Sequence, residues 1–314
     1  MRHMKAFRKG NSQREFHQSF KSQSAMEYLM TYGWAILIIA VVLGALFELG
    51  VFNPMTFAPK ASPGSCQVVR PEGAGTTNFI SLEGECNGEL PQYVASFTPI
   101  GPWIYSSTSP LPNGTSSATI IAWINPKIIQ GDGSYAGIVG IDGNNGGASG
   151  LLLSLQGSTG RPSMATWSND YVPSSGLVVT YNTWDFVAVT VSGTTATLYV
   201  NSQSESGTLF SDTDMNLKSG GYSENFRIGS TDSPGRQFNG SIANVQVYNT
   251  ALSSNDIKAL YQEGIGGAPI DLQSLVGWWP LNGNANDYSG NSYNGAPSGA
   301  VTYTSNWYSG YSAP

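Results

Sequence analysis

The spacing of hydrophobic positions changes along the chain and divides it into three parts. A polar leader occupies residues 1–22, and an almost unbroken apolar run extends from Tyr28 to Leu49. A run of that length can form a helix that crosses the hydrocarbon core of a bilayer, which needs about 20 residues. From about Leu90, short β-branched and aromatic runs alternate with Gly, Asn, Ser and Pro, a pattern typical of strands joined by turns.

The β-rich part has the period of a sheet with one buried face. Ala196, Leu198 and Val200 alternate with more polar neighbours, as a half-buried strand requires. Strands are predicted at 118–126, 184–193, 196–201, 226–230 and 241–249. Their repetition predicts a mainly β fold with two packed sheets. The exception is 251–264, which predicts a helix with Ser253 as its N-cap and Gly264 at its end.

Charge separates the leader from the rest of the chain. The first 22 residues carry six Lys or Arg and one acid, Glu15, for a net charge of +5, so the remainder of a chain of net −6 carries −11. Nucleic acid is therefore not an expected partner. Both histidines, His3 and His17, lie in the leader, so the rest of the chain lacks the commonest general base and metal ligand.

Residues 21–27 read Lys-Ser-Gln-Ser-Ala-Met-Glu at the start of the apolar run. This motif resembles the class III signal peptide of archaeal type IV pilin-like proteins. The resemblance implies that a prepilin peptidase cuts between Ser22 and Gln23, and that the helix then self-associates. Serine stands where most relatives have glycine. Glu27 would become the fifth residue of the mature chain, and its carboxylate would pair with the new amine of a neighbouring subunit's Gln23. An uncleaved single-pass anchor is the alternative.

In either case the charge bias predicts a cytoplasmic leader and an extracellular domain beyond Pro54. Two cysteines outside the cell most simply form one disulfide, so we expect Cys66 and Cys86 to pair within an extended neck. Asn113 and Asn239 fit the N-glycosylation sequon.

The order of the strand motifs carries a second resemblance. Ala-Trp-Ile-x-Pro (122–126), Asn-Thr-Trp-Asp-Phe-Val-Ala-Val-Thr (182–190), Phe-Asn-Gly-Ser-Ile (238–242) and the 251–264 helix resemble the laminin G-like, concanavalin A-like jelly roll. Residues 275–295 resemble the strand that usually opens such a domain, yet here they come last. They could complete their own sandwich or add to a neighbouring subunit.

The predicted organisation has five segments. They are a cleaved leader (1–22), a transmembrane or filament helix (23–53), a neck with the cysteine pair (54–89), a jelly roll (90–270) and a C-terminal strand segment that completes the sandwich (271–314).

Catalysis is not expected from these residues. A glycosidase needs two positioned carboxylates, whereas the close acid pairs, Glu83/Glu85 and Asp212/Asp214, lie in predicted loops. The jelly-roll resemblance instead implies binding of a glycan or protein ligand by loops, sometimes with Ca²⁺. The available oxygen ligands are Asp142, Asn144, Asp232, Asp287 and Asn291, although Asx-Gly turns are also ordinary hairpin connectors.

Aromatic residues divide into two predicted groups. Trp123, Trp184, Trp278 and Trp279 lie in strand-like runs and are expected in the core. Candidates for exposed stacking are Tyr171, Trp307, Tyr308 and Tyr311, and the alternative for the last three is a frayed C-terminal tail. Together these observations predict a pilin-like filament or adhesion subunit that displays its jelly roll at the cell surface. A monomeric membrane-tethered lectin-like protein is the alternative, and a tethered glycan hydrolase is third.

Overall fold

The computed structural model describes residues 16–48, 58–78, 82–84, 86, 89–112, 115–127, 135–143, 150–166, 169–174, 176–208, 224–230 and 236–314. The chain forms two compact units, Met1–Ala58 and Pro59–Pro314. The candidate site residues Glu85, Asn113, Asn144, Asp212, Asp214 and Asp232 lie outside the described ranges, and so do residues 1–15 of the predicted leader and residues 49–57.

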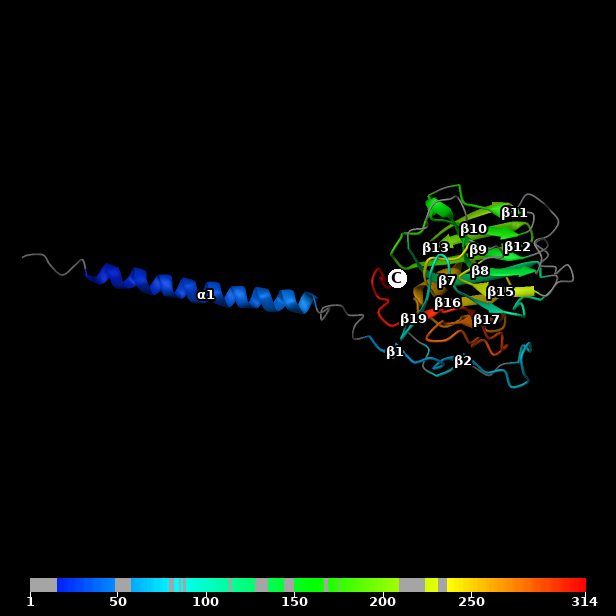
Figure 1. Cartoon of the computed structure of the whole chain (residues 1–314), viewed down its shortest axis with the longest axis horizontal. Helices are drawn as coiled ribbons and strands as arrows, with labels where there is room; N and C mark the ends of the chain where they lie inside the picture. The colour runs from blue at the N-terminus through cyan, green and yellow to red at the C-terminus, as the bar shows by residue number, and fades with distance from the viewer. Residues whose placement is uncertain are drawn as a thin grey trace, which may run out of the picture. The chain divides into compact units, whose positions relative to one another are not determined.

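The first unit contains the helix α1, Phe16–Glu48 (Figure 1). It begins before the predicted cut, so Ser22 and Gln23 both lie within helical backbone. Its stretch Met30–Glu48 has a mean hydropathy of 2.2 and is long and apolar enough to cross a membrane. The exposed large apolar side chains from Tyr28 to Phe47 keep 49–75% of their surface. Large exposed apolar surfaces usually mark a contact with lipid or with another protein.

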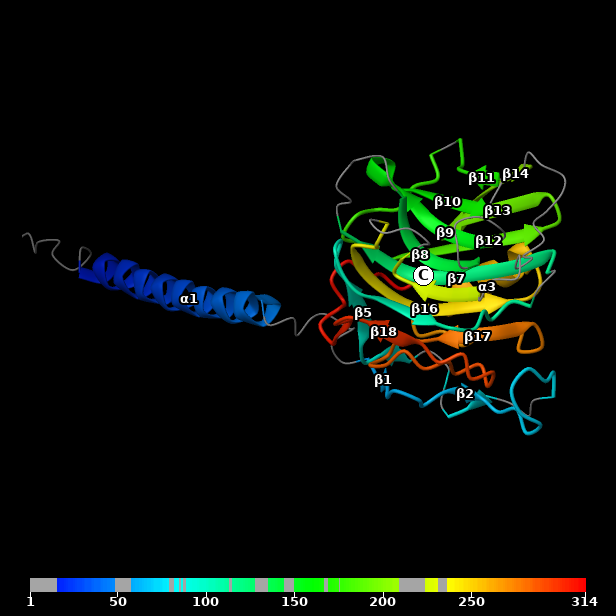
Figure 2. The same ribbon diagram turned by 45° about the vertical axis from the view of Figure 1, so that its right-hand side comes forward.

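The second unit is a sandwich of two antiparallel sheets, which confirms the predicted jelly-roll fold (Figure 2). Among the described residues, the seven-stranded sheet runs in the order β11 (Asn169–Tyr171), β10 (Arg161–Thr166), β9 (Leu151–Gln156), β8 (Tyr135–Gly143), β15 (Glu224–Ile228), β6 (Trp103–Ser106), β18 (Ala296–Ser298). The described part of the eight-stranded sheet runs β14 (Gln203–Thr208), β13 (Thr195–Val200), β12 (Asp185–Ser192), β7 (Ser117–Pro126), β16 (Gly240–Tyr248), β5 (Val94–Phe97), β19 (Thr302–Thr304), with β17 (Leu275–Trp279) paired to β16. A short 3-10 turn, η1 (Gly157–Thr159), joins β9 to β10.

Strand alternation decides which side chains enter the core between the sheets. In β7, Ile120, Ala122 and Ile124 belong to the core cluster, so Trp123 and Asn125 point to the outer face of the eight-stranded sheet. Trp123 is nevertheless 1% exposed, because the helix α3 (Ser254–Gln262) covers it. The rings of Trp123 and Tyr261 of α3 stack with centroids 5.9 Å apart.

The local signals for α3 are those predicted. Ser253 forms a capping box with Asp256, in which each side chain bonds the other residue's backbone N–H. Gly264 adopts a φ of +78°, a left-handed conformation that glycine accepts without a steric penalty. Ile257 and Leu260 are buried toward the sheet. The helix therefore covers the outer face of the eight-stranded sheet around Trp123.

The C-terminal segment completes its own sandwich. β17 pairs with β16, β18 with β6, and β19 with β5. Residues 275–295, which resemble the strand that usually opens such a domain, therefore pair within their own chain, and the strand order is permuted.

From Pro59 onward, the predicted neck is folded against the sandwich. Its strands are β1 (Lys60–Ala61), which pairs in parallel with β4 (Leu90–Pro91), and β2 (Gln67–Val68), which pairs with β3 (Leu82–Glu83). Cys66 and Cys86 form a disulfide with a Cα–Cα distance of 5.6 Å. We call residues 59–91 the strap.

Hydrogen bonds explain why the strap is not an extended spacer. Arg70 donates from Nε to the carbonyl oxygen of Ser289 and from Nη2 to that of Leu275, both at 2.9 Å, and from Nη1 to that of Thr76. Asn282 donates from Nδ2 to the carbonyl of Ala61 at 2.8 Å. Burial lowers the pKa of Arg70. Backbone carbonyl groups of the sandwich thus accept hydrogen bonds from the strap, and a carbonyl of the strap accepts one from the sandwich. The sequence pattern does not reveal these partners.

Candidate functional site

A polar groove opens on the outer face of the eight-stranded sheet. Its volume is about 350 Å³. The lining residues are Ser96, Asn125, Lys127, Asn182, Trp184, Ser241, Thr304, Asn306, Trp307 and Ser309. We call this site the polar groove.

Strand register places the floor of the polar groove. Ser241 of β16 lies opposite Asn125 of β7 on one side and Ser96 of β5 on the other. Side chains opposite one another in a sheet share a face, so these three polar groups form a row across three strands. The hydroxyl oxygens of Ser96 and Ser241 are 3.2 Å apart and share a hydrogen bond. The row is possible because the core side of the same strands is filled by their alternate apolar residues.

The C-terminal residues form one wall. Trp184 donates from its indole Nε1 to the carbonyl of Trp307 and from its backbone N–H to the carbonyl of Gly310, both at 2.8 Å. Asn125 donates from Nδ2 to the carbonyl of Ser309 at 3.2 Å. Gly310 has a φ of +77°, and a Cβ there would lie 2.2 Å from the carbonyl oxygen of Asn182. This tight turn holds the wall against the sheet.

Trp307 anchors that wall and corrects a sequence prediction. It was expected as an exposed stacking platform in the C-terminal segment, but it is 4% exposed. Its indole donates to the carbonyl of Pro91 at 3.0 Å, and its ring meets that of Trp184 edge to face at a centroid distance of 5.8 Å. Tyr308 and Tyr311 are half-buried beside it. The aromatic residues of this segment therefore hold the wall in place.

The other aromatic expectations have clear outcomes. The prediction that Trp123, Trp184, Trp278 and Trp279 are buried is confirmed, since each is at most 4% exposed. Tyr171, the remaining stacking candidate, is half-buried and donates from its hydroxyl to Glu205 at 3.4 Å. Burial, together with the nearby Glu205 carboxylate, raises the pKa of Tyr171 to about 12.

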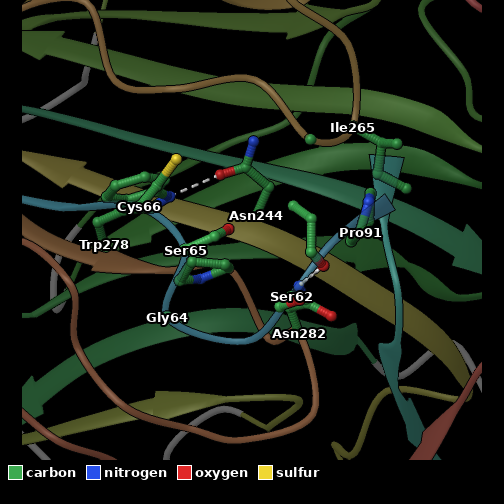
Figure 3. A pocket seen from close by; sticks show the side chains of 12 residues that line it. Ser62, Gly64, Ser65, Cys66, Pro91, Asn244, Ile265, Trp278 and Asn282 are labelled. Atoms are coloured by element: carbon green, nitrogen blue, oxygen red, sulfur yellow. Dashed lines mark hydrogen bonds between the residues drawn. The ribbon is translucent and has the colours of Figure 1, made fainter. Parts of the chain in front are cut away.

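A second cavity lies beneath the strap (Figure 3). Figure 3 shows Cys66, Asn244 and Trp278 around it, with the indole N–H of Trp278 donating to Oδ1 of Asn244 at 2.9 Å. The Asn244 amide also donates to the carbonyl of Gly267 at 2.8 Å and accepts from Gln246 at 3.0 Å. Each polar atom of the Asn244 side chain thus has a partner, and we interpret this cavity as a packing feature.

The predicted calcium ligands Asp287 and Asn291 support the fold. Asp287 accepts four hydrogen bonds at 2.9 Å, from the backbone N–H groups of Trp278, Ser289 and Tyr293 and from the Ser289 hydroxyl. Asn291 donates to the carbonyl of Val276 and accepts from the N–H of Gly75, both at 2.9 Å. Burial raises the pKa of Asp287, while its hydrogen bonds act in the opposite direction.

These contacts occupy about all the lone pairs that a carboxylate offers. Asp142 lies in β8, but its side chain is outside the described set. No cluster of three or more His, Cys, Asp or Glu suited to a metal occurs among the described residues. A calcium site stays a prediction.

The remaining candidates are dispersed. Glu83 accepts a hydrogen bond from Gln67 at 2.7 Å within the strap. Asn239 of the second sequon is half-buried next to β16. Ser22, Gln23 and Glu27 lie in α1, in the other unit.

Sequence reasoning did not identify the polar groove. Its residues come from five separate stretches of the chain, and each stretch contains only one to four of them. The one available signal was polar side chains at outward positions of otherwise apolar strands, at Asn125 and Ser241. Such positions are usually just solvated, so the signal gains meaning only from the register.

Comparison with protein-family models agrees with the fold. The family model described as the concanavalin A-like lectin/glucanases superfamily matches residues 101–258. No curated protein matches the chain. Among solved structures, the chain is similar to a proposed carbohydrate-binding protein from Bacteroides ovatus, with 20% identity and a TM-score of 0.48, covering 71% of this chain and 62% of that one. This chain therefore spans less than two thirds of the Bacteroides protein.

Two further structures are also similar. One is a heptameric SAP-like pentraxin from Limulus polyphemus, with 14% identity, a TM-score of 0.47, and coverage of 68% of this chain and 94% of that one. The other is the CBM40 of the Ruminococcus gnavus IT-sialidase bound to α2,3-sialyllactose, with 14% identity, a TM-score of 0.43, and coverage of 56% and 99%.

Proposed function

The chain belongs to the concanavalin A-like lectin/glucanases superfamily, and from this membership we propose that it is a cell-surface, pilin-like adhesion subunit that binds carbohydrate without cleaving it. In this proposal α1 anchors the protein in the membrane and assembles it with other copies. The jelly roll lies outside the cell and binds its ligand in the polar groove.

One observation carries the proposal. The chain divides into two units: a helix whose described apolar side chains from Tyr28 to Phe47 are exposed, and a jelly roll with a hydrophobic core of its own. A helix with this exposed apolar surface, and long enough to span a bilayer, is explained by a cover of lipid or of neighbouring helices. The motif at residues 21–27 favours neighbouring copies, because it resembles a signal for processing and assembly.

The groove supports the binding half of the proposal. Nine of its ten lining residues are Asn, Ser, Thr or Trp, which supply uncharged donors and acceptors or apolar surface. Saccharide hydroxyl groups both donate and accept hydrogen bonds, and amide and hydroxyl side chains match them. A concave site with converging polar groups is the expected form for a small-molecule or sugar site.

The first experiment is mass spectrometry of the mature N-terminus from native membranes. A chain that begins at Gln23 supports prepilin-type processing. A chain that keeps its leader would contradict the filament role and leave a monomeric membrane-tethered lectin-like protein.

Assembly is tested by Glu27→Gln, with Glu48→Gln as the matched control at the other end of the apolar run. We expect E27Q to be processed normally but to fail in filament assembly, because the neutral amide cannot pair with the new α-amine. E48Q should assemble like the wild type. Equal assembly of both variants would contradict the proposed role of Glu27.

A further inference from the structure

We propose that the polar groove recognises an acidic saccharide, meaning a sugar unit that carries a carboxylate or sulfate, and that Lys127 is its anion contact. This inference rests on the proposed function and specifies the ligand class of the same site.

The charge of the domain makes Lys127 unusual. Residues 59–314 contain 8 Lys or Arg and 17 Asp or Glu. Lys127 is the one charged residue that lines the groove, which has no acid in its described lining. It is exposed, and within the described part of the chain its ammonium has no carboxylate partner. A cation surrounded by neutral polar groups creates a local positive potential in an otherwise acidic domain.

A backbone hydrogen bond fixes the position of the Lys127 main chain. The N–H of Lys127 donates to the carbonyl of Asn239 at 2.8 Å, which continues the β7–β16 ladder one residue past Pro126. Because side chains alternate along a ladder, Lys127 faces the same side as Asn125, the side of the groove. The groove lining includes both residues. The ammonium therefore extends from a fixed point beside the row of neutral polar groups.

Several of those neutral groups are available to a ligand. The side chains of Asn182, Thr304 and Asn306 have no hydrogen-bond partner among the described residues. They can bind the hydroxyl groups of a sugar ring while Lys127 contacts its anionic group. The two tryptophans contribute little stacking surface, because Trp184 and Trp307 are each only 4% exposed. Polar and charged contacts must then supply most of the affinity, so the loss of one charge should have a large effect.

The test uses the full-length protein in detergent micelles and three soluble polymers: polygalacturonate, dextran sulfate and uncharged dextran. We expect binding to at least one acidic polymer that is tighter than binding to dextran and that weakens as salt is added. Lys127→Gln should weaken that binding about 10- to 100-fold, the range of one hydrogen bond to a charged group. Lys258→Gln is the control, because Lys258 is also exposed but lies on α3, outside the groove lining.

Each outcome gives a decision. Binding to polygalacturonate alone assigns a carboxylate, and binding to dextran sulfate alone assigns a sulfate ester. An equal loss in K127Q and K258Q would show nonspecific charge attraction and overturn the inference. Neutral sugar binding that is lost in Asn182→Ala/Asn306→Ala but is unchanged in K127Q would overturn the acidic ligand and keep the proposed function. Failure to bind any of these polymers and any member of a broad glycan array would overturn both.

Discussion

Replacement of Trp307 by alanine tests whether the C-terminal wall is part of the cooperative fold. Trp307 is 4% exposed and donates a hydrogen bond to the carbonyl of Pro91. A buried aromatic side chain removes about 150–250 Å² from water, which at about 25 cal/mol per Å² corresponds to roughly 4–6 kcal/mol. A denatured state that is already partly compact reduces this value by about 10–40%. The corrected value is about 2.5–5.5 kcal/mol, so we expect Trp307→Ala to lower the free energy of unfolding by about 3–5 kcal/mol, the range measured for such core truncations.

The assay is urea unfolding of the full-length protein in detergent micelles, followed by intrinsic fluorescence. Trp307→Phe is the matched control, since it keeps a ring against Trp184 and loses the hydrogen bond to Pro91. The free energy of unfolding of W307F should be about 1–2 kcal/mol lower than that of the wild type. Because the wall lines the groove, W307A should also weaken saccharide binding. A loss below about 1 kcal/mol in W307A would refute the argument, since it would mean that the C-terminal residues detach without affecting the sandwich.

Three further predictions concern the fold. Cys66→Ser/Cys86→Ser opens a loop with a sequence separation of 20. In urea titration it should lower the free energy of unfolding by about 3 kcal/mol. An unchanged urea midpoint of unfolding would contradict this, because it would mean that the strap opens before the sandwich unfolds. Ser253→Ala removes the α3 cap and should cost about 1 kcal/mol, whereas Ser254→Ala, one residue inside the helix, should cost less than half as much. For Asp287, burial raises the pKa above 3.8, so the folded state takes up this proton before the unfolded state does. The stabilising contribution of this group should therefore increase as pH falls toward 3.8 and be lost as pH rises through the folded-state pKa. Asp287→Asn should abolish that dependence in unfolding titrations, and a wild-type profile that stays the same in the variant would contradict it.

The sequence predicted the fold well because local chemistry and tertiary environment agree there. The alternation in β13 places Ala196, Leu198 and Val200 on one face, and all three are buried in the core between the sheets. The same holds for α3, where Ser253 and Gly264 are determined by local backbone requirements. These features can be predicted from residues that are close together in the sequence.

Features that depend on distant partners were not predictable in the same way. The strap is held by Arg70, two of whose carbonyl acceptors lie 205 and 219 residues further along the chain. Trp307 stands among Ser, Asn and Tyr residues that resemble an exposed terminus, and its burial depends on Pro91 and Trp184. The polar groove needs the register of β5, β7 and β16 together with the position of the C-terminal wall. No single segment encodes it.

The strap also determines how the domain would respond to mechanical force. If α1 is held in a membrane or filament, a pull on the jelly roll enters at Pro59 and first loads the parallel pairing of β1 with β4. When that pairing breaks, the chain can extend only as far as Cys66, because the disulfide passes the tension directly to Cys86. Residues 67–85 are excluded from the force path. The tension then reaches β4 and β5, and through them the strands that carry Ser96 and Ser241, so a ligand in the groove would be held by the part of the domain that resists the pull.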